Sequence, residues 1–210
     1  MMSNRFERAS WRRVGLAAAL ASTLLAAGCA PLLVGGAVFG TGLVFVDRRT
    51  SGAQLEDQAI ELKAGNRVRE AVAQRGHANV ASYNRMVLIT GEAATDADKA
   101  AIEQAVSRVE NVRSTVNELA VMGASSLTAR SGDAVLTTRV KAGLIDASDL
   151  QATAFKVVTE RSVVYLMGRV TEREGNRAAE VARGISGVAK VVKVFETLTE
   201  AELAAMQPKK

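Results

Sequence analysis

The sequence predicts an α+β fold in which one small unit occurs twice. Residues 87–91 (VLITG) and 164–168 (VYLMG) are near copies. Each copy follows a helical and a strand-like stretch, and each leads into a second helical stretch and a β-branched run. Two strands joined through a helix run parallel, whereas a tight turn makes a pair antiparallel. Each unit is therefore expected to be an αββαβ arrangement, with a three-stranded mixed sheet and two helices on one face.

The first unit is expected at residues 56–120. Its predicted elements are a helix over 56–73, hairpin strands over 79–83 and 86–90, a helix over 95–109 and a closing strand over 112–119. Thr95, followed by two aspartates, is a favourable start for the second helix, because its hydroxyl can cap the helix and acids complement the dipole.

The second unit is expected at residues 130–198, after a linker over 121–129 and before a frayed tail over 199–210. Its predicted elements are a helix from 131–133 to about 145, hairpin strands over 154–159 and 163–167, a helix over 171–185 and a strand over 188–198. Thr171 and Glu174 have the spacing of a capping box. Two helices cover only one face of three strands, so each small unit is expected to lean on its twin.

The N-terminus is expected to be an export signal. Residues 1–13 contain four arginines and one acid, and residues 14–27 are uncharged and mostly apolar, which is typical of a signal peptide over residues 1–28. Leu-Ala-Ala-Gly before Cys29 resembles the bacterial lipobox, which implies that Cys29 carries the acyl chains; the alternative is a lone buried thiol. Residues 29–55 are then a lipidated N-terminus and an apolar tether. The Ala-Pro pair after Cys29 favours the outer membrane.

Composition excludes several kinds of site. The chain has one His and one Cys, too few for a zinc finger, a three-histidine zinc site or an intramolecular disulfide. Removing residues 1–28 lowers the net charge from +5 to +2, so nucleic-acid binding is not expected. We expect no catalytic residues, no metal site and no cofactor beyond the acyl lipid on Cys29.

Three other candidate features receive structural interpretations. His77 is expected to be a solvated loop residue, because the sequence identifies no partner for it. Gly91 and Gly168 are expected to end strands and to allow the turn into the following helix. Residues 172–177, which contain two acids and two arginines, are expected to form a solvated helix face.

The helix over 133–145 is the candidate lipid-binding element. Leu136, Val140 and Leu144 are spaced as a core stripe. The remaining face holds the predicted lipid-binding residues: Val135, Thr138, Arg139, Lys141, Ala142 and Ile145. Apolar residues flanked by bases suit an anionic membrane surface, although an ordinary packing helix would show the same stripe. Residues 57–120 carry a net charge of −1 and residues 130–198 carry +3, which favours the second unit.

The αββαβ order, the Val-x-Leu-x-Gly strand and the Gly-Val step before the last strand resemble the BON domain. Two such units behind a lipobox resemble the outer-membrane lipoproteins of the DolP type. The resemblance implies a lipid-anchored outer-membrane protein facing the periplasm, which binds anionic phospholipid through the second domain and supports envelope integrity. The family often has an aromatic residue where this chain has Val135. The alternative is a tethered adaptor that docks periplasmic or outer-membrane proteins.

Overall fold

The computed structural model describes residues 47–72 and 76–206. The predicted signal peptide, Cys29 and most of the predicted tether therefore lie outside the described residues. Within the described part, no helix has both the length and the apolar character that crossing a bilayer requires.

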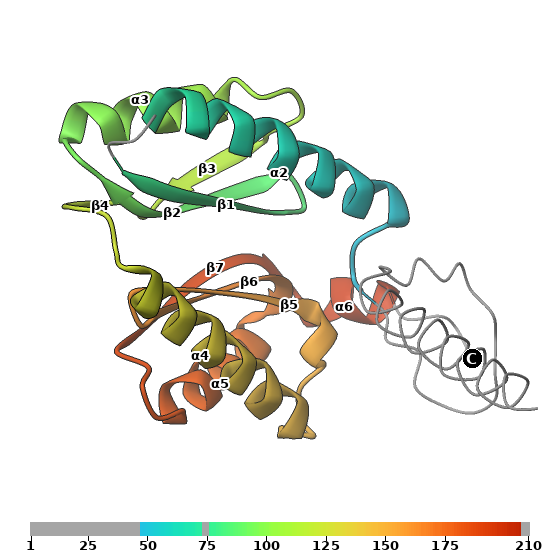
Figure 1. Ribbon diagram of the computed structural model, residues 1–210. Coiled ribbons are helices and arrows are strands. Elements are labelled where there is room, and N and C mark those ends of the chain that lie inside the picture. The colour runs from blue at the N-terminus through green and yellow to red at the C-terminus, as the bar shows by residue number, and fades with distance from the viewer. Residues whose placement is uncertain (1–46, 73–75, 207–210) are drawn as a thin grey trace, which may run out of the picture. The chain divides into compact units, whose positions relative to one another are not determined.

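The first unit has the predicted order of elements. It consists of α2 (Ser51–Val72), β1 (His77–Tyr83), β2 (Met86–Ala93), α3 (Asp96–Ser107), β3 (Ser114–Asn117) and β4 (Ala120–Val121) (Figure 1). β1 pairs antiparallel with β2, and β2 pairs in parallel with both β3 and β4. Between β3 and β4 the Asn117 side-chain oxygen accepts a hydrogen bond from the Leu119 amide at 3.2 Å, while the Glu118 amide still donates to the Ile89 carbonyl oxygen at 2.9 Å.

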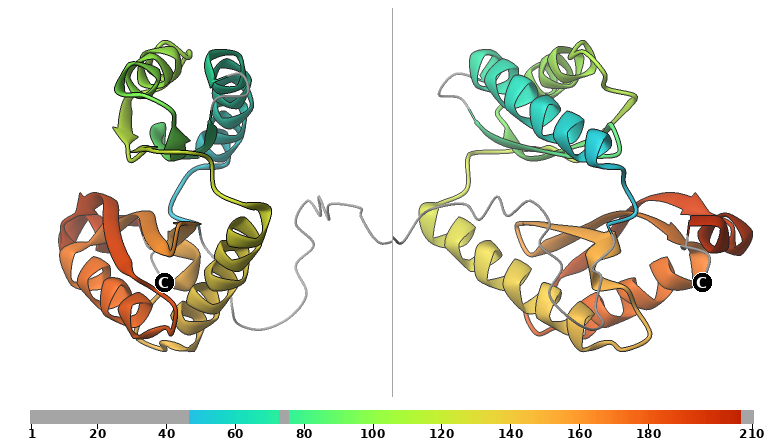
Figure 2. Two further views of the ribbon diagram at one scale, coloured as in Figure 1. Left: turned by 60° about the vertical axis from the view of Figure 1, so that its left-hand side comes forward. Right: turned by 90° about the vertical axis from the view of Figure 1, so that its right-hand side faces the viewer.

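The second unit repeats this arrangement. It consists of α4 (Leu127–Asp146), a 3₁₀ turn η1 (Ala152–Ala154), β5 (Phe155–Glu160), β6 (Val163–Thr171), α5 (Glu172–Gly184) and β7 (Lys190–Leu198). β5 and β6 are antiparallel, and β6 and β7 are parallel. In each unit the two helices cover one face of the sheet (Figure 2). The predicted αββαβ order and mixed sheets are confirmed.

Both first helices begin earlier than the sequence pattern predicted. α2 starts at Ser51 rather than at residue 56, and α4 starts at Leu127 rather than at 131–133. The cap of α4 is Ser126, whose hydroxyl accepts a hydrogen bond from the Ala129 amide at 3.1 Å. Residues 127–132 are mostly exposed and lack the apolar stripe, so hydrophobic periodicity placed the start too late.

A short helix, α6 (Glu200–Met206), replaces most of the frayed tail that we expected. The Thr199 amide donates to Glu202 Oε2 at 2.8 Å, and the Glu202 amide donates to Thr199 Oγ1 at 3.2 Å. This reciprocal pair is a capping box, and it starts the helix directly after β7.

Three apolar clusters hold the described residues together. One lies between helices and sheet in the first unit, and another does so in the second. The third joins the opposite faces of the two sheets, and its buried members are Ala81, Tyr83, Leu88, Tyr165, Met167 and Val194. The expectation that each unit leans on its twin is confirmed, because half of this third cluster comes from each unit.

A buried aspartate on α2 holds the first hairpin turn. Asn84 and Arg85 form that turn with φ values of 49° and 68°, as a type I′ turn requires. Asp57, 2% exposed, accepts hydrogen bonds from the backbone amides of both residues at 2.7 and 2.8 Å. It also accepts from the Ser82 hydroxyl at 2.6 Å and from Arg49 at 2.7 Å.

The second unit uses the same device. Asp133 on α4 is 7% exposed and accepts from the backbone amides of Arg161 and Ser162 at 2.7 and 2.8 Å. These two turn residues have φ values of 53° and 60°. The duplication therefore extends from the order of elements to a carboxylate that fixes each hairpin turn.

The prediction that Gly91 and Gly168 end strands is wrong. Both lie within strands, and a Cβ added to Gly91 would sit 2.1 Å from the carbonyl oxygen of His77. At Gly168 the corresponding clash, 2.4 Å, is with the carbonyl oxygen of Ala154. Glycine is required because the neighbouring backbone approaches too closely for a side chain.

Candidate functional site

The exposed face of α4 carries every residue of the predicted lipid-binding set. Leu136, Val140 and Leu144 are buried against the second unit's core, as the stripe predicts. The six predicted lipid-binding residues are all exposed: Val135, Thr138, Arg139, Lys141, Ala142 and Ile145. Val135 and Ile145 are 53% and 69% exposed, so this face presents large aliphatic side chains to solvent.

A groove runs beside the N-terminal half of this face. It has a volume of about 340 Å³ and is lined by Val135 and Arg139 from α4, by Arg161 from the β5–β6 turn, and by Gly187. The groove combines an apolar wall with two guanidinium-bearing residues. This combination is complementary to the acyl chains and anionic headgroups of a membrane surface.

The cations of the α4 face are not neutralised locally. Among the described residues, neither Arg139 nor Lys141 forms an ion pair, whereas Arg177 on the neighbouring α5 pairs with Asp149 at 2.9 Å. Unpaired exposed cations keep their attraction for external anions. Nothing in the structure tests whether lipid binds here, so this face stays a prediction.

The expectation of a solvated face over residues 172–177 is wrong for Glu174. Its side chain is buried and accepts two hydrogen bonds from Arg48, at 2.7 and 2.8 Å. It also completes a capping box with Thr171. Burial alone would raise the pKa of Glu174, but the Arg48 guanidinium and the Thr171 amide together hold it below its ordinary value. The Glu174 carboxylate therefore has a structural role, as the partner of Arg48 and as part of the cap of α5.

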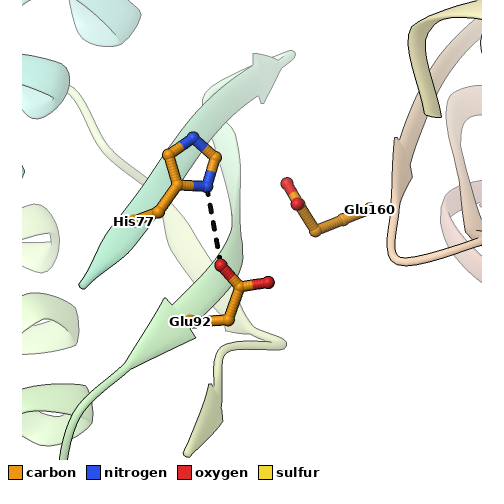
Figure 3. Close-up of side chains that lie close together, drawn as sticks. All are labelled: His77, Glu92 and Glu160. Atoms are coloured by element: carbon orange, nitrogen blue, oxygen red, sulfur yellow. Dashed lines mark ion pairs between the residues drawn. The ribbon is translucent and has the colours of Figure 1, made fainter. Parts of the chain in front are cut away.

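The expectation for His77 is also wrong. His77 is the first residue of β1, its side chain is only 21% exposed, and its Nδ1 lies 3.7 Å from Glu92 Oε2 (Figure 3). Glu160 from β5 completes a cluster whose three ligand atoms all lie within 4.8 Å of one another. Glu92 and Glu160 are held by hydrogen bonds from the Ser125 amide and the Asn79 side chain, at 3.0 and 2.9 Å.

Burial shifts the pKa values of two residues in this cluster, His77 and Glu160. It lowers the pKa of His77, and the nearby charge of Arg130 acts in the same direction while Glu92 opposes both. Burial also raises the pKa of Glu160, with Glu92 and Asp133 adding to the effect. Both shifts favour the uncharged form of the group, and a neutral imidazole is the form that can ligate a metal ion.

One signal in the sequence could have located two of the three residues in this cluster, His77 and Glu92. In the predicted hairpin, Tyr83 faces Met86, and continuing that register outward places His77 opposite Glu92, as the structure shows. Glu160 was not accessible in this way, because it reaches the cluster only through packing between the two units.

Comparison with known proteins identifies the family of both units. The BON domain family matches residues 56–123 and 132–199. The outer membrane lipoprotein DolP of Haemophilus influenzae is 36% identical over 185 residues, which cover 87% of this chain and 95% of that protein. The 21 kDa hemolysin of Actinobacillus pleuropneumoniae is 34% identical over 152 residues, which cover 71% of this chain and 78% of that protein.

Two further similarities are weaker. The osmotically-inducible protein Y of Escherichia coli is 34% identical over 87 residues, 39% of this chain and 43% of that protein. Among solved structures, the C-terminal domain of CdsD of Chlamydia trachomatis covers 64% of this chain and 96% of its own, with 9% identity and a TM-score of 0.28. This last likeness carries no argument. Two matched αββαβ units and the similarity to DolP along most of both chains show that the protein belongs to the BON domain family, as a dual-BON protein of the DolP type.

Proposed function

We propose that this protein is a lipid-anchored outer-membrane protein, facing the periplasm, that binds anionic phospholipid through α4 and supports outer-membrane integrity. One observation carries the lipid-binding part. The exposed face of α4 places Val135 and Ile145 beside two cations, Arg139 and Lys141, that have no acidic partner among the described residues.

The anchor is proposed from the lipobox. Cys29 follows a signal-like segment at the ordinary cleavage distance, and its thiol would take the acyl chains. Similarity to a protein named an outer membrane lipoprotein supports this location. Acyl chains on Cys29 would keep the BON domains close to the bilayer, so that a modest affinity of α4 for lipid suffices.

The α4 face combines two properties that suit a membrane surface, exposed aliphatic side chains and cations. Val135 and Ile145 are about ten residues apart and lie on the same side of the helix, where they can enter the acyl boundary. Arg139 and Lys141 flank them and can reach phosphate groups, each contributing about 1 kcal/mol at an anionic surface.

We infer a non-enzymatic role, because four charged groups that could suggest acid–base chemistry have structural explanations. Asp57 and Asp133 fix turns, Glu174 caps α5, and Arg177 pairs with Asp149. The Ser82 hydroxyl that donates to Asp57 is 0% exposed, so a substrate could not reach it as a nucleophile.

A protein-docking adaptor remains the second candidate. Leu55 and Leu62 on α2 are 68% and 72% exposed and lie seven residues apart, hence on one side of the helix. This apolar pair on the first domain is the observation that favours a protein partner.

The test compares vesicle binding by three forms of residues 47–210, a fragment that contains all three apolar clusters. The forms are the wild type, the Arg139→Glu/Lys141→Glu variant and a matched control, Arg67→Glu/Arg69→Glu. The control makes the same charge change, with the same spacing, on the exposed surface of α2. Binding is measured on vesicles with and without anionic lipid, at two salt concentrations.

The α4 variant should bind anionic vesicles at least about 2 kcal/mol more weakly than wild type, roughly thirtyfold. The α2 control should lose much less, since its cations lie away from the proposed face. Equal losses in both variants, or binding that ignores lipid charge and salt, would contradict the proposal. A stoichiometric protein partner without vesicle binding would favour the adaptor.

A further inference from the structure

Two buried polar atoms between the domains lack any hydrogen-bond partner among the described residues. They are Nδ1 of His77 and Oε1 of Glu92. Glu92 is 0% exposed, and an unsatisfied carboxylate oxygen at that depth is costly. In Figure 3 the side chains of His77, Glu92 and Glu160 point toward one common space.

The charges around this space do not balance. Glu92, Glu160 and Asp133 are the acids whose charges act on it, and Arg130 is the base. The Arg130 guanidinium donates to the Ser125 side chain and carbonyl oxygen, at 3.1 and 2.9 Å, rather than to a glutamate. Three acids therefore stand against one base around this space, an imbalance that a bound cation would offset.

We propose that His77, Glu92 and Glu160 bind a divalent transition metal ion, of which Zn²⁺ fits the donor set best. Zn²⁺ takes imidazole nitrogen and carboxylate oxygen ligands at about 2.0–2.2 Å, which places neighbouring ligand atoms about 3.3 Å apart. The 3.7 Å between His77 Nδ1 and Glu92 Oε2 is close to that spacing. Ca²⁺ and Mg²⁺ prefer all-oxygen sites with more ligands, so the imidazole selects against them. This replaces the expectation of no metal site.

The surrounding hydrogen bonds suit such a site. The Asn79 side chain orients Glu160, and the Ser125 amide orients Glu92. Groups of this kind fix the carboxylates around a bound metal ion. His77 and Glu92 come from the first BON domain and Glu160 from the second, so the ion would tie the two domains together. This role is independent of lipid binding through α4.

The experiment uses the full acylated chain in detergent, stripped with a chelator and dialysed. Zn²⁺ binding is measured by titration calorimetry, and Co²⁺ is added separately because its absorption spectrum reports the type of ligand. The variants are His77→Ala and Glu160→Gln, with Glu110→Gln as the control, since Glu110 is exposed and pairs with Lys63 at the surface. Circular dichroism without metal checks that each variant is folded.

The wild type and Glu110→Gln should bind one Zn²⁺ per chain and gain thermal stability from it. His77→Ala and Glu160→Gln should bind at least about tenfold more weakly and should lose the thermal gain, while keeping wild-type binding to anionic vesicles. No stoichiometric Zn²⁺ binding by folded wild type would overturn the proposal. So would equal binding by all variants, a Co²⁺ spectrum with thiolate ligation, or a preference for Ca²⁺ or Mg²⁺.

Discussion

At the scale of single residues, the same chemical solution appears twice. Asp57 and Asp133 each extend from a helix to the backbone amides of a left-handed hairpin turn. Positive φ is unfavourable for Arg and Ser, so a carboxylate that binds both amides offsets part of the cost. The charge of Asp57 is further matched by Arg49, which also stacks on Tyr83 at 4.3 Å.

Replacing the Asp57 carboxylate should destabilise the fold. Asp57→Asn should lower the free energy of unfolding by roughly 2–4 kcal/mol, because an amide leaves one amide donor and the Arg49 charge without an acceptor. Urea unfolding at pH 7 measures the loss. As the control, Asp149→Asn removes an exposed carboxylate and should cost less than about 1 kcal/mol.

The stability lost in Asp57→Asn should also depend on pH. Burial would raise the pKa of Asp57, but hydrogen bonds from Ser82, Arg85, Arg49 and Asn84 hold it below its ordinary value. A lowered folded-state pKa gives stability that is present above the unfolded pKa, about 3.9, and is lost as the pH falls through the folded value. The gap between wild type and Asp57→Asn should therefore narrow below pH 4. A gap that stays constant with pH would contradict this assignment.

Two glycines should respond in opposite ways to alanine. Gly91→Ala should destabilise by about 3 kcal/mol or more, because the methyl group would meet the His77 carbonyl and φ is +112°. Gly132→Ala should stabilise by about 0.5–1 kcal/mol, because Gly132 lies inside α4 with nothing within 4 Å of an added Cβ. Thermal unfolding of both variants checks the pair, and a stable Gly91→Ala would disprove the close approach.

At the scale of elements, the sequence pattern located the buried parts of the helices better than their exposed parts. Periodicity placed the buried half of α4 correctly and left Val135 and Arg139 on the exposed face. The same method missed the exposed first turns of that helix, because only the Ser126 cap marks their start. α6 was missed although Thr199 and Glu202 carry a capping-box signal. The break between β3 and β4 was also missed, because the hydrophobic pattern gives no sign of it.

A single substitution on the α4 face should strengthen its binding to lipid. Val135→Trp should strengthen binding to anionic vesicles, because Trp adds apolar area and prefers the membrane interface. Val135 is 53% exposed, so the larger side chain has room and folding stability should change little. Leu62→Trp on α2 is the matched control. Equal gains from both substitutions would show that any exposed Trp suffices and would contradict a specific α4 site.

At the scale of the whole molecule, the chain entering from the predicted tether is fixed to both domains. Arg48 binds Glu174 of the second domain, and Arg49 binds Asp57 of the first. Together with the apolar cluster between the sheets, these pairs order the two domains. The sequence allowed the duplication to be predicted but not the Arg48–Glu174 ion pair, because partners 126 residues apart leave no periodic signal.

The membrane anchor gives a prediction at this scale. Cys29→Ser should abolish acylation and release the protein from the membrane fraction, because stable anchoring requires two or more acyl chains at about 0.8 kcal/mol per buried CH₂. Cell fractionation with a mass measurement of the N-terminus tests it. If Cys29→Ser stays in the membrane fraction, residues 30–46 are the anchor instead.

The most direct test of the central claim asks which helix touches lipid. The full chain, purified from membranes, is placed in nanodiscs containing anionic lipid and a spin-labelled lipid, and methyl signals are recorded by NMR. Val135 and Ile145 on α4 should broaden strongly, while Leu55 and Leu62 on α2, whose side chains are 68% and 72% exposed, should not. The effect should weaken when the anionic lipid is replaced by neutral lipid. Broadening of the α2 methyl groups, or of neither helix, would contradict lipid binding through the second BON domain.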